Sequence, residues 1–232
     1  MPAYNEQENI IETLRSWYPI VEKIGPDSRL VIMDDGSKDN TFECMEHFAQ
    51  SHPQFIPLTH RNAGHGATVL ELYRYALTQG ADYVFQTDSD GQTDPKQFWG
   101  FWEDRAQFDM IIGWRKGRED GFSRILVTKT LKFVIKQIFS VSVTDANTPF
   151  RLMSAESLRQ NIGYIPDGYN LSNVILSVIY EKRHQKTDYR VITFRPRQGG
   201  VNSINIPRIF GIGRQALSDF KAINRSLSSS LK

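Results

Sequence analysis

The sequence has a single cysteine, almost no excess of either charge and no long apolar run, and each absence excludes a class of protein. One cysteine, Cys44, cannot build a disulfide framework or a zinc site of several thiolates, and it fits a reducing, cytoplasmic compartment. The 28 basic and 26 acidic side chains give a net charge of +2 without a dense basic stripe, so we expect no nucleic-acid partner. The most apolar stretch, residues 125–143, is interrupted by Lys129, Lys132 and Lys136, so we expect no membrane-spanning helix.

The composition is that of an ordinary globular protein. Apolar residues make up 40% of the chain and charged residues 23%, which excludes wholesale disorder and collagen-like sequence. A chain of 232 residues is long enough for one sizeable α/β domain. Because no internal repeat and no linker is visible, we expect a single domain over residues 1–232.

Short apolar runs alternate with amphipathic stretches, which is typical of βαβ units around a mostly parallel sheet. We expect a buried strand at 30–33, further strands at 55–58, 83–87, 110–113 and 189–194, and a loop entering a strand over 144–153. We expect a first helix that is capped by Asn5 or Glu6 and ends before Gly25. Further helices are expected at 41–52, 67–79, 98–108, 125–138, 171–181 and 207–217, the last leading to a serine-rich tail at 226–230.

Acidic or small polar residues fill three loops: 2–6, 34–37 and 88–92. In open parallel sheets ligands bind beyond the carboxyl ends of the strands, where such loops converge. Asp88 and Asp90 are one residue apart, a spacing that suits a divalent cation bridging to phosphates. The alternative is that these acids only cap turns, which is equally plausible for an isolated D-x-D pattern.

The combination of motifs resembles family 2 glycosyltransferases of the GT-A fold. The resemblance rests on residues 2–6 (PAYNE), 31–37 (VIMDDGS), 62–67 (NAGHGA) and 88–92 (DSDGQ). Further motifs at 113–115 (GWR), 145–153 and 197–203 resemble the branch of dolichol-phosphate mannose synthases and bacterial polyprenyl-phosphate glycosyltransferases. This implies an α/β fold with helices flanking a central sheet, a nucleotide-binding half at 1–112, an acceptor-side half at 113–205, and a C-terminal amphipathic helix and tail at 206–232.

The resemblance also implies roles for individual residues. The donor pocket would be formed by Pro2, Tyr4, Glu6, Asp34, Asp35, Asp88, Ser89, Arg197 and Ser203. A divalent cation, Mg²⁺ or Mn²⁺, would be held by Asp88, Asp90 and Gln92. The catalytic residues would be Asp90, Arg115, Asp145 and Arg197. Arg115 would bind an acceptor phosphate and Asp145 is the nearest candidate for a general base, whereas Asp34 and Asp35 have a capped turn as their alternative role. The role of His65 stays open.

The implied activity is inverting transfer of a sugar from a nucleoside diphosphate donor of the GDP-mannose or UDP-glucose type, as in cell-envelope biosynthesis. No Glu-Asp pair of the kind that many family members place after the D-x-D motif is visible. A phosphate acceptor needs no general base, so this favours a polyprenyl or dolichyl phosphate. The basic helix at 125–138 would then lie at the inner face of a membrane or simply pack on the sheet. The sequence makes no prediction about oligomeric state.

Two other functions remain open at this point. One is a nucleotide-sugar-binding protein without turnover. The other is a haloacid-dehalogenase-like phosphatase, whose nucleophile motif the segment 88–91 resembles. Because the family's 2–6 motif ordinarily follows a buried strand, we also expect the opening strand of the fold to be missing, and any residues upstream to read as a short Val/Ile-rich run.

Overall fold

The structure, a computed structural model, describes residues 1–115, 122–195 and 206–230, so Arg197 and Ser203 lie outside the described residues. Its strands are β1 (Pro2–Ala3), β2 (Leu30–Asp34), β3 (Phe55–Thr59), β4 (Tyr83–Gln86), β5 (Met110–Trp114), β6 (Arg151–Ser154) and β7 (Thr187–Val191). Its helices are α1 (Ile10–Ile24), α2 (Thr41–Ala49), α3 (His65–Thr78), α4 (Phe98–Glu103) with the preceding 3-10 turn η1 (Pro95–Gln97), α5 (Phe122–Phe139), α6 (Ala155–Ile162), α7 (Ser172–Lys182) and α8 (Ile206–Ser230).

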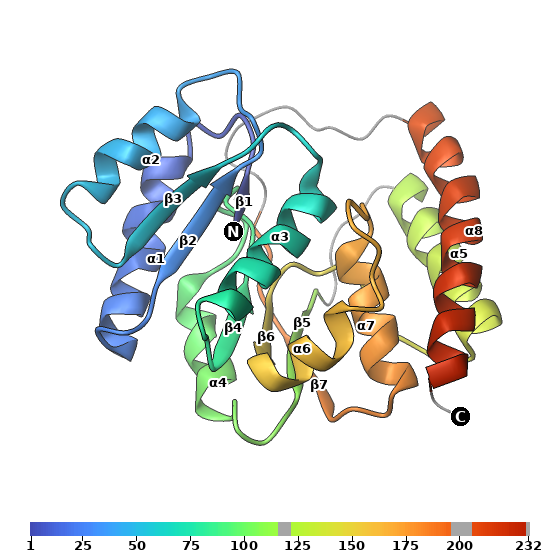
Figure 1. Cartoon of the computed structure of the whole chain (residues 1–232). Coiled ribbons are helices and arrows are strands. Elements are labelled where there is room, and N and C mark those ends of the chain that lie inside the picture. The colour runs from blue at the N-terminus through green and yellow to red at the C-terminus, as the bar shows by residue number, and fades with distance from the viewer. Residues whose placement is uncertain (116–121, 196–205, 231–232) are drawn as a thin grey trace.

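The strands form two sheets that meet where β1 and β4 end (Figure 1). The first has the order β1-β2-β3 and is parallel, as predicted. The second has the order β4-β6-β5-β7, in which β5 and β7 are parallel and β6 runs antiparallel to both β4 and β5. The Ser89 hydroxyl joins the two sheets by donating to the Pro2 carbonyl at 2.8 Å.

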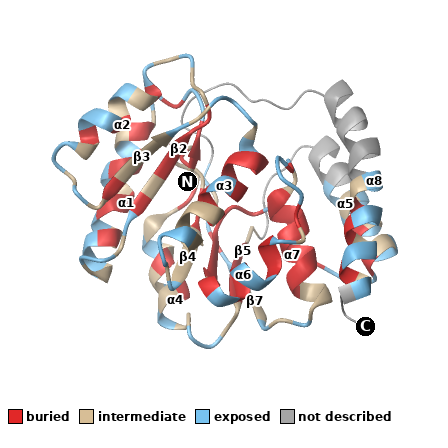
Figure 2. Ribbon diagram, viewed as in Figure 1, coloured by how far each residue is buried: buried red, intermediate tan, exposed pale blue. Residues whose placement is uncertain are grey.

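Helices cover both faces of this layer of strands, because successive side chains along each strand point to opposite faces and both sets are apolar. On β5, Met110 and Ile112 belong to one core cluster, with α3, α6 and α7, whereas Ile111 belongs to the other, with α1, α2 and α4. Successive residues of a strand point to opposite faces, so a sheet buried on both sides reads as a continuous apolar run. Figure 2 shows the buried residues in red on the strands and on the helices that pack around them.

Apart from shifts of a few residues at the ends of elements, the structure differs from the sequence expectation at four places. Pro2 and Ala3 pair in parallel with Met33 and Asp34, so a two-residue opening strand is present where none was expected. The helix expected at 98–108 ends at Glu103. Helix α6 was not predicted, although Ser154 caps it by accepting a hydrogen bond from the Ser157 N–H at 3.2 Å.

The fourth difference is that α8 continues to Ser230, so the expected serine-rich tail is helical. Phe220, Ile223 and Leu227 are buried at helical spacing, and Phe220 packs on Phe139 of α5 with ring centroids 5.5 Å apart. An apolar stripe of this kind holds a helix whose exposed positions have low helix propensity, because packing outweighs propensity.

Candidate active site

Two adjacent aspartates at the end of β2 organise the first part of the site. Asp34 is buried and its carboxylate accepts hydrogen bonds from the Ser37 N–H and the Thr59 hydroxyl, both at 3.1 Å for Oδ2. Asp35 is also buried, and its two oxygens accept from the backbone N–H groups of Ala63 and Gly64 at 2.7 and 3.0 Å. Asp34 therefore shapes its own turn, whereas Asp35 ties that turn to the loop before α3.

His60 supports Asp35 from behind. Its Nε2 lies 3.1 Å from Asp35 Oδ1, and its Nδ1 lies 2.9 Å from Glu71 Oε2 on α3. The imidazole thus links the end of the first sheet to the first turns of α3, and it is itself largely buried. A side chain fixed on both ring nitrogens adds rigidity to the loop that Asp35 holds.

The predicted donor residues 2–6 lie next to this turn. The Asn5 N–H donates to the Ser37 hydroxyl and the Glu6 N–H to the Thr41 hydroxyl, both at 2.8 Å. Glu6 is buried and its carboxylate accepts from the Asn9 side chain at 3.0 Å, whereas Tyr4 is exposed. The structure therefore brings this segment and the Asp34 turn together, with the Tyr4 ring free to meet a ligand from solvent.

The D-x-D turn follows β4 and faces the N-terminus of α3. The His65 Nε2 lies 3.0 Å from Asp88 Oδ1. Attraction to Asp88 is the largest effect on the pKa of His65 and raises it above its usual value. Burial alone would raise the pKa of Asp88. The charge of His65 and its hydrogen bond, together with the charges of the Met1 amino group and Arg115, outweigh burial, so the pKa is lowered.

The G-H-G sequence around His65 has a steric reason. A Cβ on Gly66 would lie 2.1 Å from the backbone oxygen of Asn170, and a Cβ on Gly64 would lie 2.8 Å from its side-chain oxygen. Only glycine tolerates a backbone this close, and Gly64 also has a positive φ of 92°. The loop before α7 therefore presses directly on the first turn of α3. Sequence reasoning missed Asn170; the paired glycines were its only signal.

The other residues of the D-x-D turn serve mainly to fix it. Ser89 is buried, and its backbone oxygen accepts from the Thr13 hydroxyl of α1 at 2.9 Å. Asp90 accepts from the Gln92 N–H at 3.1 Å. The Gln92 amide nitrogen donates to the Arg195 carbonyl at 2.9 Å, which leaves its Oε1 as the atom it could offer to a cation.

The oxygen atoms of this turn fit a magnesium or manganese ion whose remaining ligands would be phosphate oxygens and water. Asp88 and Asp90 supply carboxylate oxygens, and Asp88 is kept ionised by its neighbours. Within the described ranges no group of three or more His, Cys, Asp or Glu side chains is arranged to hold a metal by itself. Such ions commonly take one or two carboxylates from the protein and the rest from phosphates and water.

The second half of the site is an ion pair at the end of β5. The Arg115 Nε and one terminal nitrogen donate to the two oxygens of Asp145 at 2.9 and 2.8 Å, and the Arg115 N–H reaches the same carboxylate at 3.3 Å. Both side chains are about 15% exposed. The guanidinium also lies over the Phe194 ring, 5.2 Å from its centroid. The structure therefore joins two residues that the sequence nominated separately.

A buried arginine holds the loop that carries Asp145. Arg151 is fully buried on β6 and donates to the carbonyls of Ala146, Thr148 and Asn173, with distances from 2.7 to 3.2 Å, and to the Ser177 hydroxyl. Its partners span the 144–148 loop and the first turns of α7. Sequence reasoning noted Arg151 only as part of a motif, and its burial between two elements could not be read from it.

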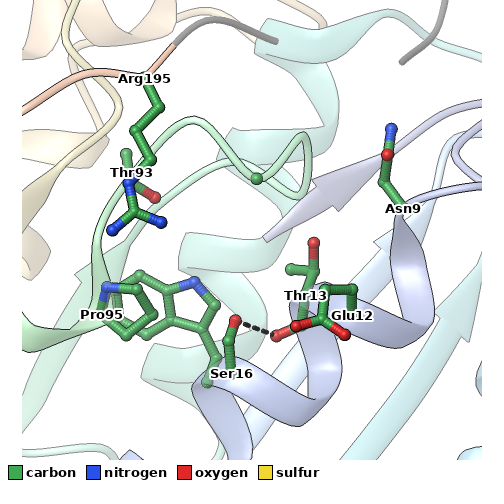
Figure 3. A pocket seen from close by; sticks show the side chains of 9 residues that line it. Asn9, Glu12, Thr13, Ser16, Thr93, Pro95 and Arg195 are labelled. Atoms are coloured by element: carbon green, nitrogen blue, oxygen red, sulfur yellow. Dashed lines mark hydrogen bonds between the residues drawn. The ribbon is translucent and has the colours of Figure 1, made fainter. Parts of the chain in front are cut away.

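A small groove opens between α1 and the segment that follows β4 (Figure 3). Asn9, Glu12, Thr13, Ser16 and Trp17 of α1 line it, facing Gly91, Thr93, Pro95 and Arg195. Arg195 is paired with Asp94 at 3.1 Å. Among the described residues, none of the site residues predicted from the sequence lines this groove.

Comparison with known proteins gives an assignment for this arrangement. The family model described as "Glycosyl transferase family 2" matches residues 1–162. An undecaprenyl-phosphate 4-deoxy-4-formamido-L-arabinose transferase of Pectobacterium atrosepticum is 27% identical over 148 residues, which cover 62% of this chain and 44% of that protein. An undecaprenyl-phosphate mannosyltransferase of Micrococcus luteus is 26% identical over 166 residues, covering 68% and 66%. The chain thus spans less than half the length of the first of these relatives.

A relative of similar length and a solved structure cover nearly all of the chain. An uncharacterised protein of Methanocaldococcus jannaschii is 24% identical over 230 residues, covering 94% of this chain and 96% of that one. Glucosyl-3-phosphoglycerate synthase from Mycobacterium tuberculosis, in complex with Mn²⁺ and UDP-glucose, aligns with a TM-score of 0.67 at 18% identity, over 96% of this chain and 76% of that one. The shared fold is GT-A, as predicted, and it excludes the phosphatase reading, because here the aspartate motif follows the fourth strand rather than the first.

Proposed function

Because the chain belongs to glycosyl transferase family 2, we propose that it moves a sugar from a nucleoside diphosphate donor to the phosphate of a polyprenyl-type lipid. The observation that carries the choice of acceptor is Arg115. Its guanidinium is held by Asp145 at the end of β5 and acts electrostatically on Asp88 of the D-x-D turn. A guanidinium is the side chain best suited to hold a phosphate, through its fixed fork of N–H donors.

The donor half of the reaction falls to residues 1–112. The nucleoside lies between Tyr4 and the Asp34 turn, where a carboxylate can accept from ribose hydroxyls or base N–H groups. The diphosphate lies at Asp88 and Asp90, in a turn that Ser89 and Gln92 fix. Glu6 and Asp35 hold the surrounding backbone in place. The proposal covers donors of the GDP-mannose and the UDP-glucose type. Arg197 and Ser203, outside the described residues, remain assigned to the donor phosphates.

Asp88, Asp90 and the Oε1 of Gln92 would hold the divalent ion, Mg²⁺ or Mn²⁺. When bound, the ion neutralises charge on the diphosphate leaving group. The protein's own residues do the rest. His65 fixes one oxygen of Asp88, and the Gln92 N–H fixes one oxygen of Asp90, so the two carboxylates are held in place before the donor arrives. Preorganised charge of this kind is usually the largest contribution to catalysis.

Asp145 acts here as the residue that orients Arg115. Both its oxygens accept from the guanidinium, so they are not turned toward an incoming hydroxyl. A phosphate acceptor is already anionic near neutral pH and attacks the sugar carbon directly, forming the new C–O bond as the bond to the diphosphate breaks on the opposite face. This geometry inverts the configuration and needs no general base. Residues 113–205 form the acceptor half, which meets the lipid at the inner face of a membrane.

The donor half is tested by calorimetric titration of GDP, UDP and other nucleoside diphosphates in the presence and absence of Mn²⁺. We expect one of them to bind, and Asp90→Asn to remove the metal dependence. Asp94→Asn, a nearby acid that is paired with Arg195 instead, should leave binding unchanged. Failure to bind any nucleoside diphosphate would exclude this function, and binding without turnover of any sugar donor would favour a nucleotide-sugar-binding protein.

A further inference from the structure

Helix α5 carries a basic face that is turned to solvent. Lys129, Lys132, Phe133 and Lys136 follow one another at helical spacing, and all four are exposed. Phe133 is 64% exposed, the largest fraction among the large apolar side chains of the described residues. We call these four residues the lysine face of α5. Ile135 and Phe139 of the same helix are buried in the core, and Leu131, Val134 and Ile138 pack against it.

Packing in the core does not explain why these charged side chains are gathered on one face. The α5 sequence contains no acidic residue, so its lysines have no partner on their own helix. Helix α8, which packs beside α5 at the end of the molecule opposite α1 and α2, exposes Lys221 and Arg225 as well (Figure 1). The three lysines on this one face of α5 repel one another, a cost that an anionic partner would remove.

We infer that the lysine face of α5 docks the protein on an anionic lipid bilayer. Each lysine close to such a surface strengthens binding about fivefold, and a lysine stem can lie along the interface while its ammonium contacts lipid phosphates. An aromatic ring among them suits the boundary between headgroups and acyl chains. A second copy of this chain would bring two basic faces together, which the charge disfavours.

The position of α5 in the chain couples this surface to the active site. It begins at Phe122, shortly after Arg115, the residue assigned above to the acceptor phosphate. Docking on the bilayer therefore brings the acceptor half to the surface where a lipid phosphate is presented. Among the described residues no helix is long and apolar enough to cross a membrane.

The experiment is co-sedimentation of the full chain with vesicles of phosphatidylcholine alone or with about one-third phosphatidylglycerol, without donor or acceptor. We expect binding only to the anionic vesicles, weakened by salt. The triple variant Lys129→Ala, Lys132→Ala, Lys136→Ala should bind about 100-fold more weakly, and Phe133→Ser more weakly than the wild type at high salt, where the apolar contribution dominates.

A matched control separates the effect of the lysine face of α5 on vesicle binding from the effect of net charge. Lys23→Ala, Lys96→Ala, Lys186→Ala removes three exposed lysines from other elements and should retain most of the binding. The inference would be overturned if both triple variants lost vesicle binding equally, or if the wild type bound neutral vesicles equally well. Displacement of the vesicles by RNA, or a dimer that Phe133→Ser dissociates, would also overturn it. Because no substrate is present, the result is independent of whether the proposed transfer reaction is right.

Discussion

The pairing of Arg115 with Asp145 distinguishes two roles for the same carboxylate. If Asp145 only orients Arg115, Asp145→Asn should raise the KM for the acceptor about tenfold or more, with little change in the KM for the donor, because the guanidinium loses one of its fixed positions. The measurement is steady-state kinetics with each substrate varied in turn.

The control for that variant is Asp104→Asn, which removes a carboxylate partner from Arg190 away from the site and should leave both KM values unchanged. If Asp145 were a general base, kcat would fall at constant acceptor KM and the acid limb of the pH profile would disappear. That pattern would contradict the orienting role.

The His65–Asp88 pair predicts a stability that depends on pH. The pKa of His65 is raised in the folded protein, so its contribution is present at low pH and is lost as pH rises through the folded value. The pKa of Asp88 is lowered, so its contribution is present at high pH and is lost as pH falls through its folded value. The two contributions coexist only between these limits.

His65→Ala should therefore lower the melting temperature most at about pH 5 to 6, and less above the raised pKa of His65. Thermal denaturation of both proteins in EDTA, from about pH 4.5 to about pH 9, measures this difference. A constant difference across that range would show that His65 acts only by packing.

At the level of secondary-structure elements, α3 is held in place by the loop before α7. Gly66→Ala would place a methyl group 2.1 Å from the Asn170 backbone oxygen, so the first turn of α3 must shift. We expect a loss of about 1–3 kcal/mol in the free energy of unfolding. We also expect weaker donor binding, because His65 moves with that turn and its contact with Asp88 is disturbed.

Gly100→Ala in α4 is the matched control. A Cβ there meets nothing within 4 Å, and alanine has the higher helix propensity, so stability should stay the same or rise slightly. Urea unfolding measures both variants. Equal stability of the two alanine variants would mean that the contact between α3 and Asn170 is looser than the structure has it.

Arg151 joins the 144–148 loop to α7 in the same way. Arg151→Met fills a similar volume but leaves buried carbonyls of both elements without donors, and we expect a loss of about 3 kcal/mol or more. Arg159→Met, an exposed arginine on α6, should change stability by less than about 0.5 kcal/mol. A loss of similar size in both variants, measured by urea unfolding, would contradict the structural role of Arg151.

For the whole molecule, the sequence predicted the fold better than the contacts within the site. The buried strands and amphipathic helices of the first half follow directly from period and turn residues, as at Leu30–Asp34 and Thr41–Ala49. Helix α6 and the end of α8 were missed because their helical pattern depends on neighbours that only the fold brings near. The contact of Asn170 with Gly66 joins segments about a hundred residues apart, and the paired glycines indicate a close approach without indicating which segment makes it.

Ion pairs between distant segments could not be predicted from the sequence either. The sequence predicted different roles for Asp145 and Arg115. Only the folded structure shows that the two side chains form an ion pair with each other. The sequence also left the role of His65 open, because a histidine between glycines has no assigned partner until α3 is placed against β4.

The central claim is that the acceptor is a phosphate rather than a hydroxyl, and one comparison tests it directly. The full chain is incubated with a labelled nucleoside diphosphate sugar, Mn²⁺, and either a polyprenyl phosphate or the matching polyprenol. The account predicts label in the lipid phosphate product alone, reduced about 100-fold or more by Arg115→Lys, which keeps the charge but loses the fork of donors. Transfer to the polyprenol at a comparable rate would contradict it.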